Sequence, residues 1–208
     1  MKKKIIKTLP YCFLLAHSLT YAATPISGPY VRAFAGFSYP TSGNVNTNLF
    51  SNPEYKRGYD AGAQLGYKSG PIRYEFEETY TDSKLNTFSY AGTKQSTVTG
   101  KTSATSLLLN VYYDFEDLNT VLAPYLGVGV GYAHIINTLN STSPSTQSYD
   151  RSDRMFAYKA HAGLAYNFSE SISTDIGYQY FRTKHSNTFN QNFQTHLINF
   201  GVTYRYNN

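Results

Sequence analysis

The 208-residue sequence has little of several things that mark other classes of protein. Only 15% of its residues are charged, it has no tryptophan, and it has one cysteine. Its mean hydropathy is −0.41, and it lacks an uninterrupted apolar run of roughly 20 residues, the length that a membrane-spanning helix requires. A bundle of membrane helices is therefore excluded.

Aromatic residues, in contrast, are abundant, with 21 tyrosines and 13 phenylalanines. Disordered chains are poor in aromatic residues because they lack the apolar surface needed to bury a core. We therefore expect a folded chain, and its length fits one compact unit.

The N-terminal residues have the order of a secretory signal peptide. Four lysines occur in the first seven residues, an apolar stretch follows over residues 9–19, and the segment ends in Ala22 and Ala23. We expect residues 1–23 to be removed by cleavage after Ala22 or Ala23, leaving residues 24–208 as the mature protein. Without those lysines, 14 basic side chains face 13 acidic ones, so a nucleic-acid partner is not expected. Cys12 lies inside the signal, and the mature chain has no cysteine.

Apolar and polar residues then alternate with a period of two in eight segments. Between residues 57 and 68, for example, Tyr59, Leu65 and Tyr67 alternate with glycine and polar residues. This pattern predicts β-strands, because a helix of 3.6 residues per turn would spread the polar side chains over every side. The segments are residues 30–39, 57–68, 71–80, 103–115, 123–136, 156–168, 172–182 and 198–206.

The connections between these segments are alternately short and long. Residues 69–71, 116–122 and 169–171 are short, whereas residues 40–56, 82–102, 137–154 and 183–195 are long and rich in Ser, Thr and Asn. An even number of strands with this alternation is typical of an outer-membrane barrel, and only a closed barrel crosses lipid without an unpaired strand edge. The sequence thus predicts an all-β fold, an eight-stranded antiparallel up-and-down transmembrane β-barrel in a Gram-negative outer membrane, with both termini periplasmic. A secreted soluble barrel or sandwich is the alternative, and it would turn its apolar face inward.

Two stretches of sequence resemble a known family. Residues 106–115 (SLLLNVYYDF) and 123–133 (APYLGVGVGYA) are similar to the central hairpin of the opacity-protein and surface-antigen family of eight-stranded outer-membrane barrels, and residues 176–180 (IGYQY) resemble its seventh strand. The resemblance implies a surface antigen or adhesin-like role. It also implies that the barrel assembly machinery reads the closing strand, although here Tyr206 is followed by two asparagines.

The inner face of the predicted barrel carries charges of both signs. An eight-stranded barrel is only wide enough to be filled by side chains, and buried charges must pair because an unpaired buried ion is costly. We expect a polar plug; a narrow gated ion path is the alternative function. The expected lumen charges are Arg32, Asp60, Lys68, Arg73, Glu75, Glu77, Asp114, Lys159, Asp175 and Arg205.

The long connections are the expected site of contact with other molecules. Tyrosine among small polar residues suits the recognition of proteins, so a host surface or matrix protein is a possible partner, and solvated loops with no ligand are the alternative. The cationic second connection suits anionic sugars or lipopolysaccharide phosphates. The candidate contact residues are Tyr55, Lys56, Lys84, Lys94, Lys101, Tyr149, Arg151 and Arg154.

Signals for catalysis are weak, and we expect no enzyme, cofactor or metal. Residues 185–187 (HSN) look like a segment of outer-membrane lipid A deacylases, which makes a lipid A-modifying hydrolase the third alternative. However, His185 and Ser186 are adjacent and would point to opposite faces of a strand, and no acidic residue follows Asp175. The glycines at 127, 129 and 131 lack the spacing of a nucleotide loop and are expected to thin the inner wall.

Overall fold

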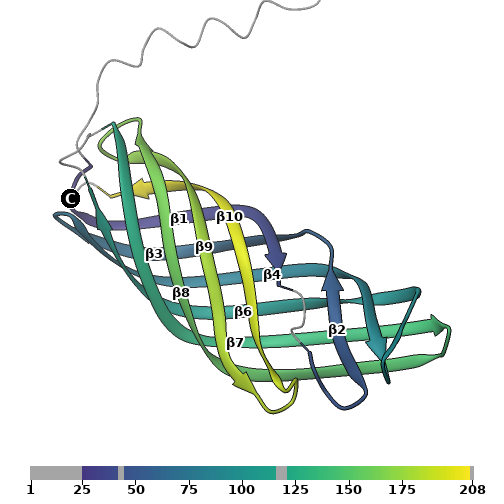
Figure 1. The fold of residues 1–208 in the computed structure, drawn as a ribbon. Coiled ribbons are helices and arrows are strands. Elements are labelled where there is room, and N and C mark those ends of the chain that lie inside the picture. Colours follow the sequence, from purple (N-terminus) through teal and green to yellow (C-terminus); the bar gives the residue numbers. More distant parts are fainter. Residues whose placement is uncertain (1–24, 42–44, 116–120, 207–208) are drawn as a thin grey trace, which may run out of the picture.

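The computed structural model describes residues 25–41, 45–115 and 121–206, and every element within them is a strand or a turn (Figure 1). The predicted signal peptide therefore lies outside the described residues. No helix among the described residues is long and apolar enough to cross a membrane. The strands are β1 (Gly28–Pro40), β2 (Phe50–Tyr55), β3 (Gly58–Ser69), β4 (Ile72–Tyr90), β5 (Thr93–Lys94), β6 (Thr97–Asp114), β7 (Leu122–Ser143), β8 (Gln147–Asn167), β9 (Ile172–Ser186) and β10 (Gln191–Arg205).

Eight of these strands close into an antiparallel barrel. The order around the ring is β1, β3, β4, β6, β7, β8, β9 and β10, and β10 returns to pair with β1 from Tyr30↔Arg205 to Pro40↔Thr195. Closure leaves the transmembrane wall without a free strand edge. The prediction of an eight-stranded barrel is confirmed.

Alternate side chains point to opposite faces of this wall, as the sequence predicted. On β7, Leu126, Val128 and Val130 are exposed on the outside, whereas Tyr125 is buried inside. An apolar outer band with aromatic residues at its edges is the surface that a membrane barrel presents to lipid. A soluble barrel would have buried those residues, so that alternative is wrong.

The predicted long connections are wrong in structural type. Most of residues 82–102 and 137–154 belong not to loops but to continuations of β4, β6, β7 and β8, which extend well beyond the predicted ends at residues 80 and 136 (Figure 1). The first long connection contains β2, which pairs with the extension of β4, as β5 does. The serine, threonine and asparagine content that indicated loops instead reflects strands that leave the lipid and no longer need an apolar outer face.

Candidate functional site

The lumen of the barrel holds two groups of ion pairs in the half nearer to the chain termini. Arg32 donates from Nε and Nη2 to the two carboxylate oxygens of Asp175, at 2.8 and 2.6 Å, and from Nη1 to Gln64 at 2.8 Å. Arg73 contacts both Asp114 and Glu75, each at 2.9 Å. Such paired oxygens hold the guanidinium groups in fixed orientations.

A third group surrounds Glu77, which lies farther from the chain termini along the lumen. Its carboxylate accepts hydrogen bonds from Lys159, from Gln64 at 2.6 Å, from Asn110 at 2.9 Å and from Thr79 at 2.7 Å. The side chains of Glu77 and Lys159 are each 1% exposed. Four donors on one buried carboxylate compensate for the hydration it has lost.

His161 joins these groups across the barrel. Its Nδ1 lies 3.0 Å from the hydroxyl oxygen of Tyr112 and its Nε2 lies 3.2 Å from that of Tyr125, which donates to Asp175 at 3.0 Å. The space for Tyr112 comes from Gly127, where an added methyl group would overlap the tyrosine ring. The glycine stripe thins the wall in the way that its alternation on one strand face indicated.

The remaining predicted lumen residues also point inward. Asp60 is 1% exposed and accepts a hydrogen bond from Asn199, and Lys68 lies 2.8 Å from Asp114. Arg205 is 4% exposed and lines, with Arg73, a cavity of about 20 Å³. A second lumen cavity, beside Glu77, measures about 10 Å³. Each is about the size of one water molecule.

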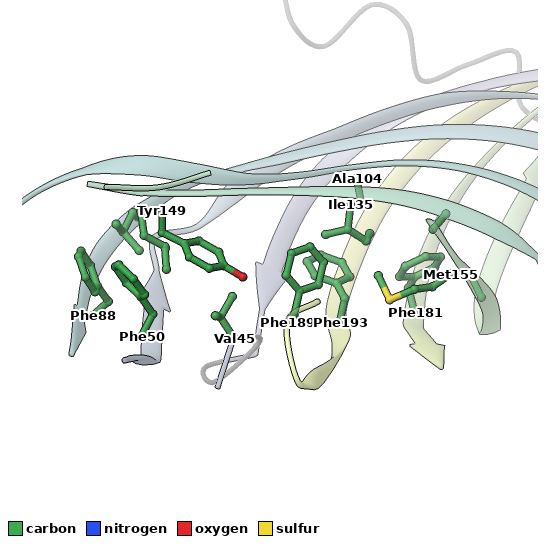
Figure 2. Packing of buried hydrophobic residues seen from close by; sticks show 14 of the residues in the cluster. Val45, Phe50, Phe88, Ala104, Ile135, Tyr149, Met155, Phe181, Phe189 and Phe193 are labelled. Atoms are coloured by element: carbon green, nitrogen blue, oxygen red, sulfur yellow. The ribbon is translucent and has the colours of Figure 1, made fainter. Parts of the chain in front are cut away.

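Above this polar layer the barrel is closed by an apolar cluster that the sequence did not predict. Figure 2 shows side chains of this cluster: Val45 and Phe50 come from the connection between β1 and β3, and Phe189 comes from the turn between β9 and β10. These two connections are neighbours around the ring, because β1 pairs with β10. These three side chains are at most 9% exposed. We call this folded extracellular part the cap. Its core consists of Val45, Phe50, Leu85, Phe88, Ala104, Leu108, Ala133, Ile135, Leu139, Tyr149, Met155, Ala157, Phe181, Phe189, Phe193 and Leu197.

Aromatic rings and backbone hydrogen bonds fix the cap. The ring of Phe50 lies 5.9 Å from that of Phe88 and 4.9 Å from that of Tyr149. The backbone nitrogen of Asn46 donates to the carbonyl oxygen of Phe189 at 2.9 Å, which joins the first connection to the last. The signal was present in the sequence as apolar residues recurring within the polar connections, but their partners are about 40 to 140 residues away along the chain.

The structure divides the candidate contact residues into two tyrosines that pack within the cap, of which Tyr55 is half-buried, and six exposed basic residues. Tyr55 donates to Asn137 at 3.0 Å, and Tyr149 is 9% exposed and belongs to the core of the cap. Burial raises the pKa of both tyrosine hydroxyls above their ordinary value. Lys56, Lys84, Lys94, Lys101, Arg151 and Arg154 are exposed.

The weak signal for catalysis at residues 185–187 falls at the end of β9 and in the turn that follows it. No group of three His, Cys, Asp or Glu side chains in the described ranges is arranged to hold a metal ion. Ser186 is buried, donates to Asp153 at 2.5 Å and accepts from the backbone nitrogen of Phe189 at 3.1 Å, whereas the adjacent His185 is exposed. The serine therefore caps the β9–β10 turn.

The comparisons with known proteins agree with this architecture. The family described as "Outer membrane protein beta-barrel domain" matches residues 11–206. Outer membrane protein PagN of Salmonella typhimurium is 27% identical over 192 residues, covering 80% of this chain and 78% of PagN. Opacity protein opA65 of Neisseria gonorrhoeae is 24% identical over 176 residues, covering 73% of this chain and 69% of the relative.

Solved structures show the same fold. The crystal structure of Neisserial surface protein A superimposes with a TM-score of 0.61 at 19% identity, covering 86% of this chain and 98% of that protein. OprG from Pseudomonas aeruginosa has a TM-score of 0.56 at 10% identity, covering 89% of this chain and all of that one. The resemblance to the opacity proteins is confirmed, and the protein lies in the Gram-negative outer membrane with its cap at the cell surface. The chain belongs to the family of outer-membrane β-barrel proteins.

Proposed function

We propose that the cap contacts host-cell or matrix proteins and that the barrel below it serves as a rigid base. The observation that carries this proposal is the apolar core of the cap, which fixes the β4–β6 and β7–β8 hairpins in one arrangement. A preorganised surface binds without first paying the entropy of ordering flexible loops. The names of the relatives, opacity proteins among them, support a role at the cell surface.

The test is adherence of a non-adherent surrogate bacterium that displays the barrel. Because Lys84 pairs with Lys101 and Thr138 is opposite Asp150, each hairpin can be cut just beyond one of these pairs and closed by a two-residue turn without changing strand register. We expect adherence to host cells or matrix proteins with the intact cap and its loss in the truncated variants. Heat-dependent gel mobility checks that each variant forms a barrel. Equal adherence of all folded variants and the empty surrogate would overturn the proposal.

The narrow-pore alternative is disfavoured by the filled lumen and the apolar core above it. We expect no conductance steps from the protein in planar bilayers, and no change on neutralising Glu75 or Arg73. Steps whose size changes in the Glu75→Gln variant would restore the channel interpretation.

The chain is also proposed not to be an enzyme, because Ser186 is buried and hydrogen-bonded to Asp153. Lipid A extracted from cells that express the protein should have the same mass spectrum as lipid A from control cells. A change in acyl content that disappears in the Ser186→Ala variant would contradict this.

Two further proposals concern the export of the chain and its assembly into the membrane. The N-terminal segment is proposed to be cleaved after Ala22 or Ala23, which the intact mass of the mature protein tests directly. The assembly machinery is proposed to recognise β10, whose outward residues alternate through Phe200, Val202 and Tyr204 up to Tyr206. Replacing Tyr206 by serine should then slow the appearance of the heat-modifiable form in cells.

A further inference from the structure

One edge of β8 has no neighbouring strand in the cap. β7 pairs with β8 from Gln147 to Tyr166, whereas the pairing of β8 with β9 ends at Ala157. Within the described part of the chain, residues 147–156 therefore have a strand on one side only. Figure 1 shows this part of β8 in the β7–β8 hairpin, which projects beyond the ends of β9 and β10. We call residues 147–156 the free edge.

The alternation of the ladder identifies the backbone groups that the free edge presents. At the other end of β8, the backbone nitrogen of Asn167 donates toward β7, to the carbonyl oxygen of Val121 at 2.9 Å. The next backbone nitrogen, that of Phe168, donates toward β9, to Ile172 at 3.0 Å. Successive residues of an antiparallel strand direct their N–H and C=O groups to alternate sides, and the register of β7 with β8 has no shift. The even-numbered residues of the free edge therefore direct these groups away from β7.

Two of these backbone groups are bound only by side chains of their own strand. The Nη1 atom of Arg151 donates to the carbonyl oxygen of Asp150 at 2.9 Å, and the backbone nitrogen of Arg154 donates to Oδ1 of Asp153 at 2.8 Å. Asp150, Arg151 and Arg154 are exposed. A strand that pairs with this edge would take over both backbone groups, and the two charged side chains would be released to contact it.

The charges of the free edge are complementary to those of a second, antiparallel copy of the same edge. With Ser152 opposite Ser152 of the copy, Asp150 lies opposite Arg154. In the same register Arg151 lies opposite Asp153. Moving the centre by one residue places two arginines or two aspartates directly opposite each other, which destabilises a sheet. Charges on a strand edge ordinarily prevent pairing with other strands, and here their order favours a copy of the edge itself.

We propose that a second copy of this chain pairs with the free edge, antiparallel about Ser152, and that the two barrels lie in facing membranes. Two barrels in one membrane are related by an axis along its normal, and a strand tilted by about 45° then crosses its copy at about 90°. An axis that lies between two facing membranes and is perpendicular to the sheet reverses the strand instead. Backbone hydrogen bonds then supply affinity, and the charges supply specificity. This contact is separate from the host contact proposed for the cap.

Clustering of phosphatidylcholine vesicles that contain the mature protein tests the proposal. These vesicles carry no glycan, so clustering reports contact between copies of the protein. We expect wild-type vesicles to cluster, and Asp150→Arg or Arg154→Asp to slow clustering roughly tenfold, because each change makes two attractive pairs of the dimer repulsive. Vesicles of these two variants should cluster with each other, since opposite charges then face each other again. The matched control is Lys94→Asp, at an exposed position of β5, which should cluster like the wild type.

A disulfide bond between two copies measures the register. The mature chain has no cysteine, so Ser152→Cys supplies a single thiol. Residues opposite each other in a hydrogen-bonded antiparallel pair have Cα atoms about 5.5 Å apart, within reach of a disulfide. The two copies of residue 148 would be eight residues apart along the strand, about 26 Å. Oxidation of clustered vesicles should therefore link the Ser152→Cys variant into dimers and leave the control Ser148→Cys as monomers.

Four results would overturn the proposal, with heat-dependent gel mobility confirming that each variant is folded. One is clustering of wild-type vesicles no faster than that of protein-free vesicles. Another is equal clustering by the wild type and the two charge variants, or no recovery when vesicles of these variants are mixed. A third is a Ser152→Cys dimer in vesicles that do not cluster, which would place both copies in one membrane. The last is host-cell adherence that depends on these charges while vesicles do not cluster, which would assign the edge to a strand of another protein.

Discussion

Replacing Phe88 by alanine separates the stability of the cap from that of the barrel. Phe88 is fully buried, and its ring stacks on that of Phe50 at 5.9 Å and an interplanar angle of 28°. Truncation of a buried phenylalanine typically costs about 3–5 kcal/mol, from lost transfer energy and the cavity that remains. Because the transmembrane strands pair independently of this side chain, the cost should fall on local opening of the cap.

Trypsin treatment of whole cells measures that opening. When opening and closing are fast relative to cleavage, the cleavage rate follows the population of the open form. A cost of this size raises that population by roughly two to four orders of magnitude. Cleavage within the cap, at sites such as Lys94 and Arg151, should accelerate accordingly in the Phe88→Ala variant.

The control is Asn86→Ala, an exposed position two residues away on the same strand, which should be digested like the wild type. Heat-dependent gel mobility should be unchanged in both variants, because the barrel remains closed. If Phe88→Ala is digested no faster than Asn86→Ala, the cap is not held by its apolar core, and the preorganised surface proposed above loses its basis.

Three further predictions concern the lumen and the base of the cap. Lys159→Met leaves the Glu77 carboxylate buried without its cation and should destabilise the refolded barrel by about 3–5 kcal/mol. The double variant that also carries Glu77→Leu should recover much of this loss. Equal urea midpoints for the single and the double variant would contradict the prediction. The hydrogen bond from Lys101 to Asp82 raises the pKa of that lysine. The stabilising effect of this bond is therefore complete below the ordinary lysine pKa and is lost as pH rises through the raised value. NMR titration should show a lower Lys101 pKa in the Asp82→Asn variant, and a titration curve identical to that of the wild type would refute this. Gly127→Ala should lower the thermal midpoint because its methyl group displaces a tyrosine ring of the lumen, and a midpoint equal to that of the wild type would show that the wall gives way instead.

The transmembrane wall could be predicted from the sequence because each of its strands carries its own signal. Leu126, Val128 and Val130 meet lipid whatever their neighbours are, so a period of two in the chain is enough to assign their face. The charges of the lumen follow from the same alternation, since an inward side chain on one strand is inward in every closed barrel. The number of strands and the membrane location follow with them.

Which lumen charges pair with each other could not be predicted from the sequence. Arg32 binds Asp175 across the closure of the barrel, and Glu77 takes Lys159 although Arg73 is nearer in the chain and in fact contacts Glu75. Partner choice depends on the stagger between strands, which places residues from β1, β4, β8 and β9 at the same height. Alternation along one strand contains no information about that stagger.

The sequence by itself thus determined which faces meet lipid and lumen, because the bilayer acts on each strand separately. Only the tertiary structure decided that the polar connections fold into a cap and that residues 147–156 of β8 keep a free edge there. The contacts of the cap join segments far apart in the chain, such as Asn46 and Phe189. They exist only once barrel closure and strand register have brought the segments together.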